Sequence, residues 1–197
     1  MKGPLFYSKI LLFGEYGIIK DSKGLSIPYS FYKGALKTDQ DPNHSAIESN
    51  LNLKKFIQYL ATLDASLVTF NSDQLQKDVN EGMYFDSSIP QGYGVGSSGA
   101  LVAAIYDKYA NDKITVLENL TREKLLKLKA VFSEMESFFH GKSSGLDPLN
   151  SYLSIPILIN SQDNIEATGI PSQNTNGKGA VFLLDSGIIG ETAPMVG

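Results

Sequence analysis

Apolar residues follow a strand-like spacing in some segments of the chain and a helical spacing in others. Residues 5–13 (LFYSKILLF) and 29–37 are apolar and aromatic enough for strands, and residues 14–19 are a candidate partner strand after a bend. Residues 52–63 carry apolar residues at helical spacing, and residues 98–109 contain no proline that would stop a helix. Because strands and helices alternate irregularly, we predict an α+β fold with helices covering one face of a mixed sheet.

The clearest helix begins after Thr121, which can cap it, and ends at Gly141. Its apolar stripe consists of Leu125, Leu128, Phe132, Met135 and Phe139. Glu136 lies eleven positions after Leu125, which at about 100° per residue is within about 20° of the same direction. A carboxylate on the buried face is costly unless it is paired or bound to a metal. The plain alternative is an edge residue whose carboxylate reaches water.

The other segments are less regular. The polar residues 38–50 predict a loop with a solvated His44, and residues 67–80 are ambiguous. Short strands are predicted at residues 82–86, 151–159 and 179–185, with a linker at residues 172–178.

Composition narrows the classes of protein. With 21 acidic and 17 basic residues the net charge is −4, so nothing electrostatic favours nucleic acid. No apolar run is long enough for a membrane span and no signal peptide is recognised, so we expect a cytoplasmic protein. The absence of cysteine excludes disulfides, and two histidines cannot form a multi-histidine metal site. Any metal should therefore be a hard cation on oxygen ligands.

A glycine-rich turn occupies the start of residues 90–103 (PQGYGVGSSGALVA) and runs into the helix predicted at residues 98–109. Glycine lets the backbone approach an anion closely, and the amides of a first helical turn point at it with the helix dipole behind them. One serine hydroxyl can ligate Mg²⁺ between phosphate oxygens. The turn therefore predicts a phosphate-binding site.

Two other phosphate motifs compete for this turn. A P-loop requires a lysine after the glycines, and none follows. The dinucleotide fingerprint GxGxxG is present at Gly94, Gly96 and Gly99, with Glu118 downstream to hold a ribose. That fingerprint should follow a buried apolar strand, whereas residues 85–93 are polar and contain a proline. A purely structural glycine turn also stays open.

A second set of candidate residues follows the clearest helix. Residues 140–147 (HGKSSGLD) form a helix end, a turn of small residues that leaves room for a ligand, and the carboxylate of Asp147. Lys9 stands inside an apolar strand, where its charge should need a partner such as Asp147. The alternatives are a structural turn and a lysine on a solvated strand face. Together the two sets supply a phosphate cradle, metal ligands, a cation and a carboxylate, which phosphoryl transfer to an alcohol requires.

These residues resemble the GHMP kinases, named for galactokinase, homoserine, mevalonate and phosphomevalonate kinases, and are closest to the mevalonate kinase members. The family motif Pro-x-x-x-Gly-Leu-Gly-Ser-Ser-Ala/Gly is matched from Pro90 to Gly99. The family's N-terminal motif, Pro-Gly-Lys followed by apolar residues and Gly-Glu-His/Tyr, is similar to residues 8–16. Tyr7 and Ser8 stand here in place of its Pro-Gly. In mevalonate kinases a metal-binding glutamate precedes the catalytic aspartate by eleven positions, and here 147 − 136 = 11.

The resemblance implies a role for each matched position. It implies that Asp147 is the catalytic base or charge stabiliser, with Lys9 as its partner. It implies that Mg²⁺ is held by Ser98 and Glu136, and that ATP is cradled by Pro90, Gly92, Gly94, Gly96, Ser97 and Ser98. The acceptor pocket would be lined by Glu15, Tyr16, His140 and Thr192.

The acceptor implied first is mevalonate, giving 5-phosphomevalonate for isoprenoid precursor synthesis. GEY together with GSSG is also similar to phosphomevalonate kinase, which ranks second. The resemblance further implies an N-terminal domain at residues 1–175, like ribosomal protein S5 domain 2, with the active site in an interdomain cleft. The third family motif is missing, so we expect residues 176–197 to be the start of a truncated C-terminal domain.

Hypotheses from other classes stay open. A non-catalytic ligand- or protein-binding relative should lack Asp147, Lys9 or the metal ligands, and none is lost. An RNA-binding module would share the S5-like half, but the acidic balance argues against it. The sequence does not define the oligomeric state, so a homodimer also stays open.

Overall fold

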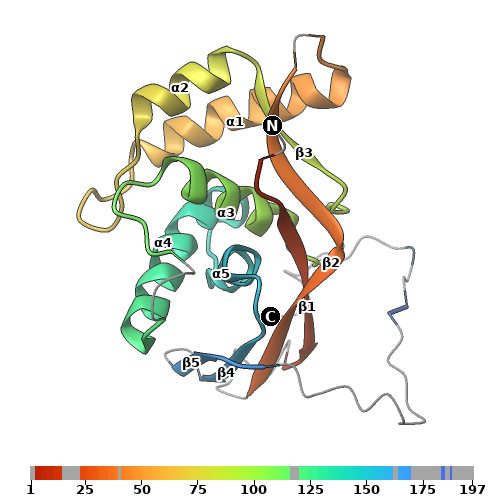
Figure 1. Ribbon diagram of the computed structural model, residues 1–197, viewed down its shortest axis with the longest axis vertical. Helices are drawn as coiled ribbons and strands as arrows, with labels where there is room; N and C mark the ends of the chain where they lie inside the picture. Colours follow the sequence, from red (N-terminus) through yellow and green to blue (C-terminus); the bar gives the residue numbers. More distant parts are fainter. Residues whose placement is uncertain are drawn as a thin grey trace.

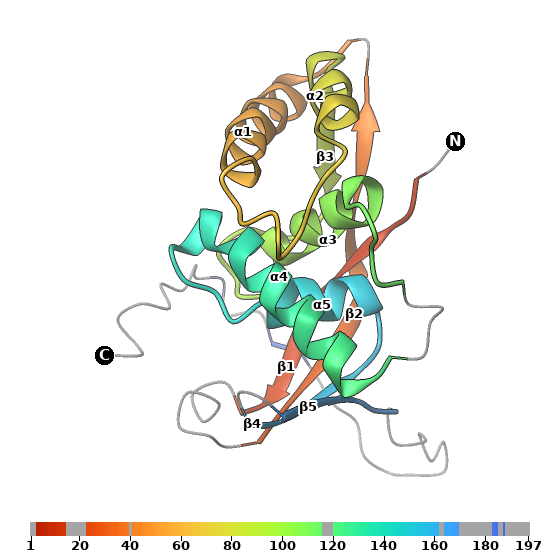
Figure 2. The same ribbon diagram turned by 90° about the vertical axis from the view of Figure 1, so that its left-hand side faces the viewer.

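The computed structural model describes residues 3–14, 23–39, 41–115, 120–161, 164–169, 183–184 and 187. Its strands are β1 (Phe6–Phe13), β2 (Gly24–Thr38), β3 (Met83–Ser87), β4 (Ile157–Ser161) and β5 (Asn164–Ala167). Its helices are α1 (His44–Leu60), α2 (Ser72–Asn80), α3 (Ser97–Tyr109), α4 (Arg122–His140) and α5 (Leu146–Leu153). Helices α3, α4 and α5 cover one face of the sheet, and α1 and α2 pack beside β3 (Figures 1 and 2). The predicted α+β class is confirmed.

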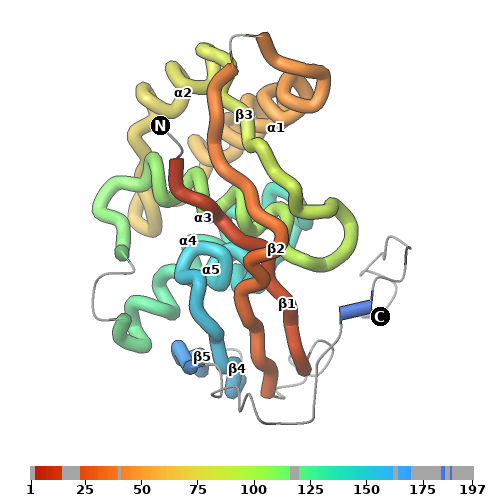
Figure 3. Tube along the Cα trace, turned by 45° about the vertical axis from the view of Figure 1, so that its right-hand side comes forward, coloured from red at the N-terminus to blue at the C-terminus, as the bar shows by residue number. Residues whose placement is uncertain are grey.

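The sheet is organised around the long strand β2. Strand β1 pairs with one edge of β2, while β4 and β3 share the other edge, at residues 24–26 and 34–38 of β2. Figure 3 follows β2 from β3 at one end to β4 at the other, and β5 pairs with β4. We expected a mixed sheet, but every pairing among the described strands is antiparallel. This topology argues against a dinucleotide fold, which needs a parallel sheet.

Helix α4 has the predicted boundaries and buried face. The Thr121 side chain accepts a hydrogen bond from the Lys124 amide, and Gly141 ends the helix at a φ of 71°. Its stripe joins the core, with Phe139 only half-buried at one end. Glu136 lies on that buried face and is 3% exposed, as the helical spacing predicted.

Two segments differ from the prediction. Residues 38–50 are not all loop, because α1 begins at His44 and the Asn43 side chain caps it by accepting from the Ala46 amide. His44 itself is exposed, as expected. Residues 151–159 are not one strand: α5 continues to Leu153, and β4 begins only at Ile157. Only the last three residues of α5, Ser151 to Leu153, fall in the predicted strand, and all three are buried. A short buried segment of this kind does not by itself distinguish a helix end from a strand.

The remaining predictions have mixed outcomes. The ambiguous residues 67–80 contain α2, which Asn71 caps through its side chain. The candidate strand at residues 14–19, the linker at 172–178 and the strand at 179–185 fall largely outside the described residues. In the part of the chain that the structure describes, no helix has both the length and the apolar character to cross a membrane.

Candidate active site

Four elements bring the predicted site residues together beside the sheet. Strand β1 supplies Lys9, the start of α3 supplies Ser98, the last turns of α4 supply Glu136, and the first turn of α5 supplies Asp147. They form two pairs, Lys9 with Asp147 and Ser98 with Glu136. The charges of Asp147 and Lys9 both act on the pKa of Glu136, so the two pairs belong to one electrostatic unit.

The Lys9–Asp147 ion pair lies under the glycine-rich turn. Lys9 Nζ is 3.0 Å from Asp147 Oδ1, and the side chains are 12% and 33% exposed. The Lys9 amide donates to the Val95 carbonyl at 3.0 Å, which ties the turn to β1. At Gly96, whose φ is +81°, a Cβ would stand only 3.1 Å from Lys9 Cγ and 3.7 Å from Asp147 Oδ2. The absence of a side chain at this position lets the turn pass directly over the pair.

Close packing of α3 against α5 sets the position of Asp147. A Cβ at Gly99 would lie 2.7 Å from the carbonyl carbon of Asp147 and 2.7 Å from the Pro148 nitrogen, so the two backbones touch here. The Ser151 hydroxyl donates to the Tyr7 carbonyl at 2.7 Å and holds α5 on β1. The helix that carries Asp147 is therefore held against both α3 and β1.

Glu136 accepts a hydrogen bond on each carboxylate oxygen. Ser98 Oγ donates to Oε1 at 2.9 Å, and Ser143 Oγ donates to Oε2 at 2.5 Å. Burial raises the pKa of Glu136 to about 7, with a further rise from the Asp147 charge, while both serines and Lys9 oppose that rise. His140 Nε2 is 3.0 Å from Ser98 Oγ. With the Ser98 hydrogen directed to Glu136, His140 must carry its proton on Nε2 to make this bond.

The glycine-rich turn presents an uncapped helix start. Gly96 is the N-cap of α3 and provides no side chain to bond the first-turn amides. Gly92 and Gly94 are exposed, with φ of 79° and 67°, whereas Pro90 and Ser97 are half-buried. Free amides at the positive end of a helix attract anions, so this turn has the form of a phosphate site.

The oxygen atoms beside this turn suit a hard cation. Among the described residues, no group of three or more His, Cys, Asp or Glu side chains could hold a metal. A metal here would take Ser98 Oγ and one oxygen of Glu136 and would fill its other positions with water or phosphate oxygens. Mg²⁺ binds in this manner, through one or two carboxylates with substrate phosphates, so the residues fit Mg²⁺.

Some predicted acceptor residues are not placed. Glu15, Tyr16 and Thr192 lie outside the described residues. His140, expected in the acceptor pocket, lies against Ser98 beside the predicted metal ligands. The contact of Ser143 with Glu136 was not foreseen. The available signal was its position two residues beyond Gly141, where the chain reverses after α4 and returns toward Glu136.

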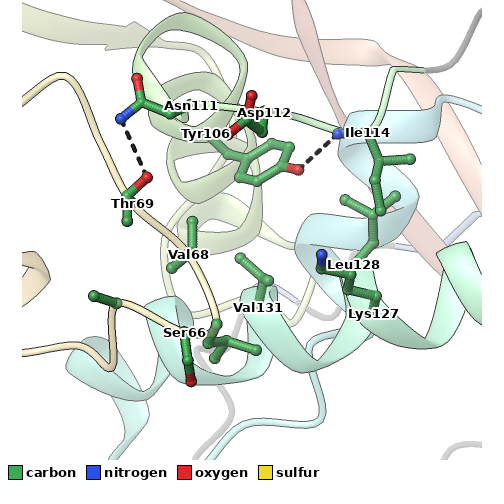
Figure 4. A pocket seen from close by; sticks show the side chains of 12 residues that line it. Ser66, Val68, Thr69, Tyr106, Asn111, Asp112, Ile114, Lys127, Leu128 and Val131 are labelled. Atoms are coloured by element: carbon green, nitrogen blue, oxygen red, sulfur yellow. Dashed lines mark hydrogen bonds between the residues drawn. The ribbon is translucent and has the colours of Figure 1, made fainter.

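A separate cavity of about 210 Å³ lies elsewhere, between residues 65–69, residues 111–114 and α4 (Figure 4). Inside it the Ile114 amide donates to the Tyr106 hydroxyl at 3.0 Å, and the Asn111 side chain donates to Thr69 Oγ1 at 3.2 Å. None of the residues that line the cavity is a predicted site residue. The cavity is therefore distinct from the site around Glu136.

Comparison with known families identifies the class of protein. Residues 57–154 match the family model described as the GHMP kinases N terminal domain. The matched range contains the glycine-rich turn, Glu136 and Asp147. The chain belongs to the GHMP kinase family through this domain, and members of the family are generally small-molecule kinases.

Three solved mevalonate kinases are among the structures that the chain matches. The Methanococcus jannaschii enzyme is 16% identical, with 85% of this chain and 56% of that chain covered and a TM-score of 0.49. The L. major enzyme, solved in complex with R-mevalonate, is 19% identical, with 80% and 51% covered and a TM-score of 0.42. The enzyme from Staphylococcus aureus MRSA252 is 18% identical, with 83% and 53% covered and a TM-score of 0.43. The chain thus spans about half the length of these structures. Curated protein sequences give no match.

Proposed function

We propose that the chain carries the ATP and Mg²⁺ site of a small-molecule kinase that phosphorylates an alcohol, with mevalonate as the first candidate. The observation that carries the proposal is the convergence of two pairs, Lys9 with Asp147 and Ser98 with Glu136, beside an uncapped helix start. Each member supplies a part that phosphoryl transfer needs, and the four come from separate elements.

The phosphates of ATP would lie at the start of α3. Gly94 and Gly96 have positive φ, and the amides that follow Gly96 lack a side-chain cap. Bound Mg²⁺ supplies charge neutralisation of the phosphate oxygens, which stabilises the transferring group. The part of the protein would be to hold the Ser98 and Glu136 oxygens close together, and the 2.9 Å bond between them supports this role.

Asp147 would accept the proton of the attacking hydroxyl. Lys9 occupies Oδ1, so Oδ2, which faces Gly96 beneath the glycine-rich turn, is left for the substrate. The alcohol oxygen forms a bond to the γ-phosphorus, the bond from that phosphorus to the β–γ bridging oxygen breaks, and ADP leaves. The proton passes from the hydroxyl to Asp147 and then to solvent. Lys9 keeps the carboxylate in place and stabilises negative charge nearby.

The acceptor is proposed on the sequence motif rather than on a described pocket. Residues 140–147 favour mevalonate, giving 5-phosphomevalonate in isoprenoid precursor synthesis, and phosphomevalonate ranks second. His140, which contacts Ser98, would line the acceptor pocket together with Glu15, Tyr16 and Thr192. We also propose that residues 1–175 form the N-terminal domain, that residues 176–197 lie outside it, and that the protein is cytoplasmic.

A comparison of candidate substrates tests this proposal. The purified protein is given ATP and Mg²⁺ with mevalonate, phosphomevalonate, homoserine or galactose, and ADP release is followed. We expect mevalonate to give the highest kcat/KM. Reaction with phosphomevalonate alone would favour the second candidate, and a higher kcat/KM with homoserine or galactose would move the assignment to another GHMP kinase. Binding of ATP without turnover of any alcohol would favour a non-catalytic relative.

A further inference from the structure

Ser143 lies at the centre of the turn between α4 and α5. Its Oγ donates to Glu136 Oε2 at 2.5 Å and accepts from the Gly145 amide at 3.0 Å. An amide can only donate, so the hydroxyl hydrogen of Ser143 is left for the carboxylate. The Ser133 hydroxyl donates to the Ser143 carbonyl at 2.6 Å and fixes the backbone of the turn against α4. The direction of the Ser143 hydroxyl is therefore set by its neighbours.

The two oxygens of Glu136 have different surroundings. Oε1 accepts a hydrogen bond from Ser98, one of the two residues that we assign to Mg²⁺. Oε2 accepts one from Ser143, which lies in the turn after α4. Glu136 is 3% exposed, so little water is present to replace either hydroxyl. A serine bound to a cation presents its lone pair to the metal, and Ser143 would then be the hydroxyl that still holds the carboxylate.

We propose that Ser143 is a positioning residue that occupies Oε2 of Glu136 and so leaves Oε1 alone for the metal. The inference rests on the proposed Mg²⁺ site. Ser143 touches no phosphate or metal in this arrangement and acts through Glu136. The same hydroxyl also holds the Gly145 amide at the start of α5, two residues before Asp147. Ser143 thus orients the carboxylate of Glu136, the proposed metal ligand. It also fixes the start of α5, the helix that carries the proposed base.

The expected effect is on metal-dependent binding rather than on binding of the nucleotide itself. Residues that orient a metal ligand typically contribute 10- to 100-fold to metal affinity. In Ser143→Ala the carboxylate can rotate, and we expect the increase in ATP affinity that Mg²⁺ provides to fall about tenfold. ATP affinity measured in EDTA should stay unchanged. A residue with a merely structural role would lower both affinities together.

The experiment is calorimetric titration of the purified protein with ATP, with Mg²⁺ and with EDTA. Ser137→Ala is the matched control, because Ser137 adjoins Glu136 but donates to the Ser133 carbonyl instead, at 2.7 Å. Ser143→Thr keeps a hydroxyl and should retain most of the Mg²⁺ effect. Ser143→Cys keeps the size of the side chain with a weaker donor and serves if the alanine variant does not fold.

The outcomes separate the two proposals. An unchanged Mg²⁺ effect in Ser143→Ala, or an equal loss in Ser137→Ala, overturns the role of Ser143 and leaves the proposed function in place. Failure of both the alanine and cysteine variants to fold would also count against it, since it would make Ser143 a stability residue. ATP binding by the unaltered protein without any Mg²⁺ effect would overturn the metal site and this inference together.

Discussion

Lys9 Nζ lies 3.0 Å from Asp147 Oδ1, and this ion pair joins strand β1 to the first turn of α5. The lysine side chain is 12% exposed, so removing its partner leaves a poorly hydrated charge. The aspartate is 33% exposed and remains open to an incoming group. One member of the pair is therefore mainly held by the fold and the other is accessible for chemistry.

The effects of Lys9 and Asp147 on the free energy of unfolding should depend on each other. Lys9→Met, Asp147→Asn and the double variant form a cycle, and we expect a coupling free energy of about 1 kcal/mol from denaturant unfolding. The exposed pair Lys37 and Asp86, with side chains 53% and 49% exposed, is the control and should give a few tenths of a kcal/mol at about physiological salt. Equal coupling in the two cycles would mean that the Lys9 pair is no more than a surface ion pair.

The same variants should be non-additive in turnover. Asp147→Asn keeps the shape of the side chain and removes its charge, so kcat should fall on the order of 10²-fold or more. Lys9→Met should lower kcat comparably, and the double variant should be much less impaired than the product of the two losses. Initial rates of ADP release measure this. A kcat near that of the unaltered protein in Asp147→Asn would remove the carboxylate from the mechanism.

Glu136 should make the folded state less stable as the pH rises. Its pKa is raised by burial from 4.5 to about 7, so the folded protein holds the proton more tightly than the unfolded chain. The stabilising contribution of that proton is complete below about pH 4.5 and is lost as the pH passes about 7. Glu136→Gln should therefore be more stable than the unaltered protein at pH 8, by no more than about 3 kcal/mol.

Urea unfolding at several pH values measures the Glu136 effect. The advantage of Glu136→Gln should shrink between pH 7 and pH 5, where the unaltered carboxyl is protonated in the folded protein. A difference between the two proteins that is constant from pH 5 to pH 8 would contradict the raised pKa.

Gly99 should be intolerant of a side chain. In Gly99→Ala the new Cβ would meet the backbone of Asp147 and Pro148 at 2.7 Å, so α5 must move away from α3. Overpacking of this kind costs about 1 to 3 kcal/mol and should also displace Asp147. Gly169→Ala is the control, because a Cβ there meets nothing within 4 Å and φ is not positive. Thermal unfolding compares the two, and equal midpoints would contradict the close approach.

The sequence predicts local features of the site well. The buried position of Glu136 follows from the helical period of the stripe that begins at Leu125, and the ends of α4 follow from Thr121 and Gly141. These features depend on residues near one another in the chain. The start of α1 was missed because its first two residues, His44 and Ser45, are polar and exposed, so the capping Asn43 was the available signal.

Contacts between distant segments could not be predicted in the same way. The bond from Ser98 to His140 depends on how the start of α3 lies against the end of α4, which no local period specifies. The strand predicted at residues 151–159 began too early, because the last turn of α5 is buried and does not show where the helix ends. Ser143 lies in a turn whose direction is set by Gly145, where φ is +73° and a Cβ would be 2.2 Å from the Lys129 carbonyl oxygen.

Titration of the protein with ATP, in the presence and absence of Mg²⁺, tests the central claim most directly. The proposed site predicts that Mg²⁺ tightens ATP binding, and that Ser98→Ala and Glu136→Gln each lose most of this effect while remaining folded. Tight ATP binding that needs no metal and is unchanged in both variants would contradict the assignment of Ser98 and Glu136 as ligands. Absence of ATP binding under either condition would contradict the kinase site itself.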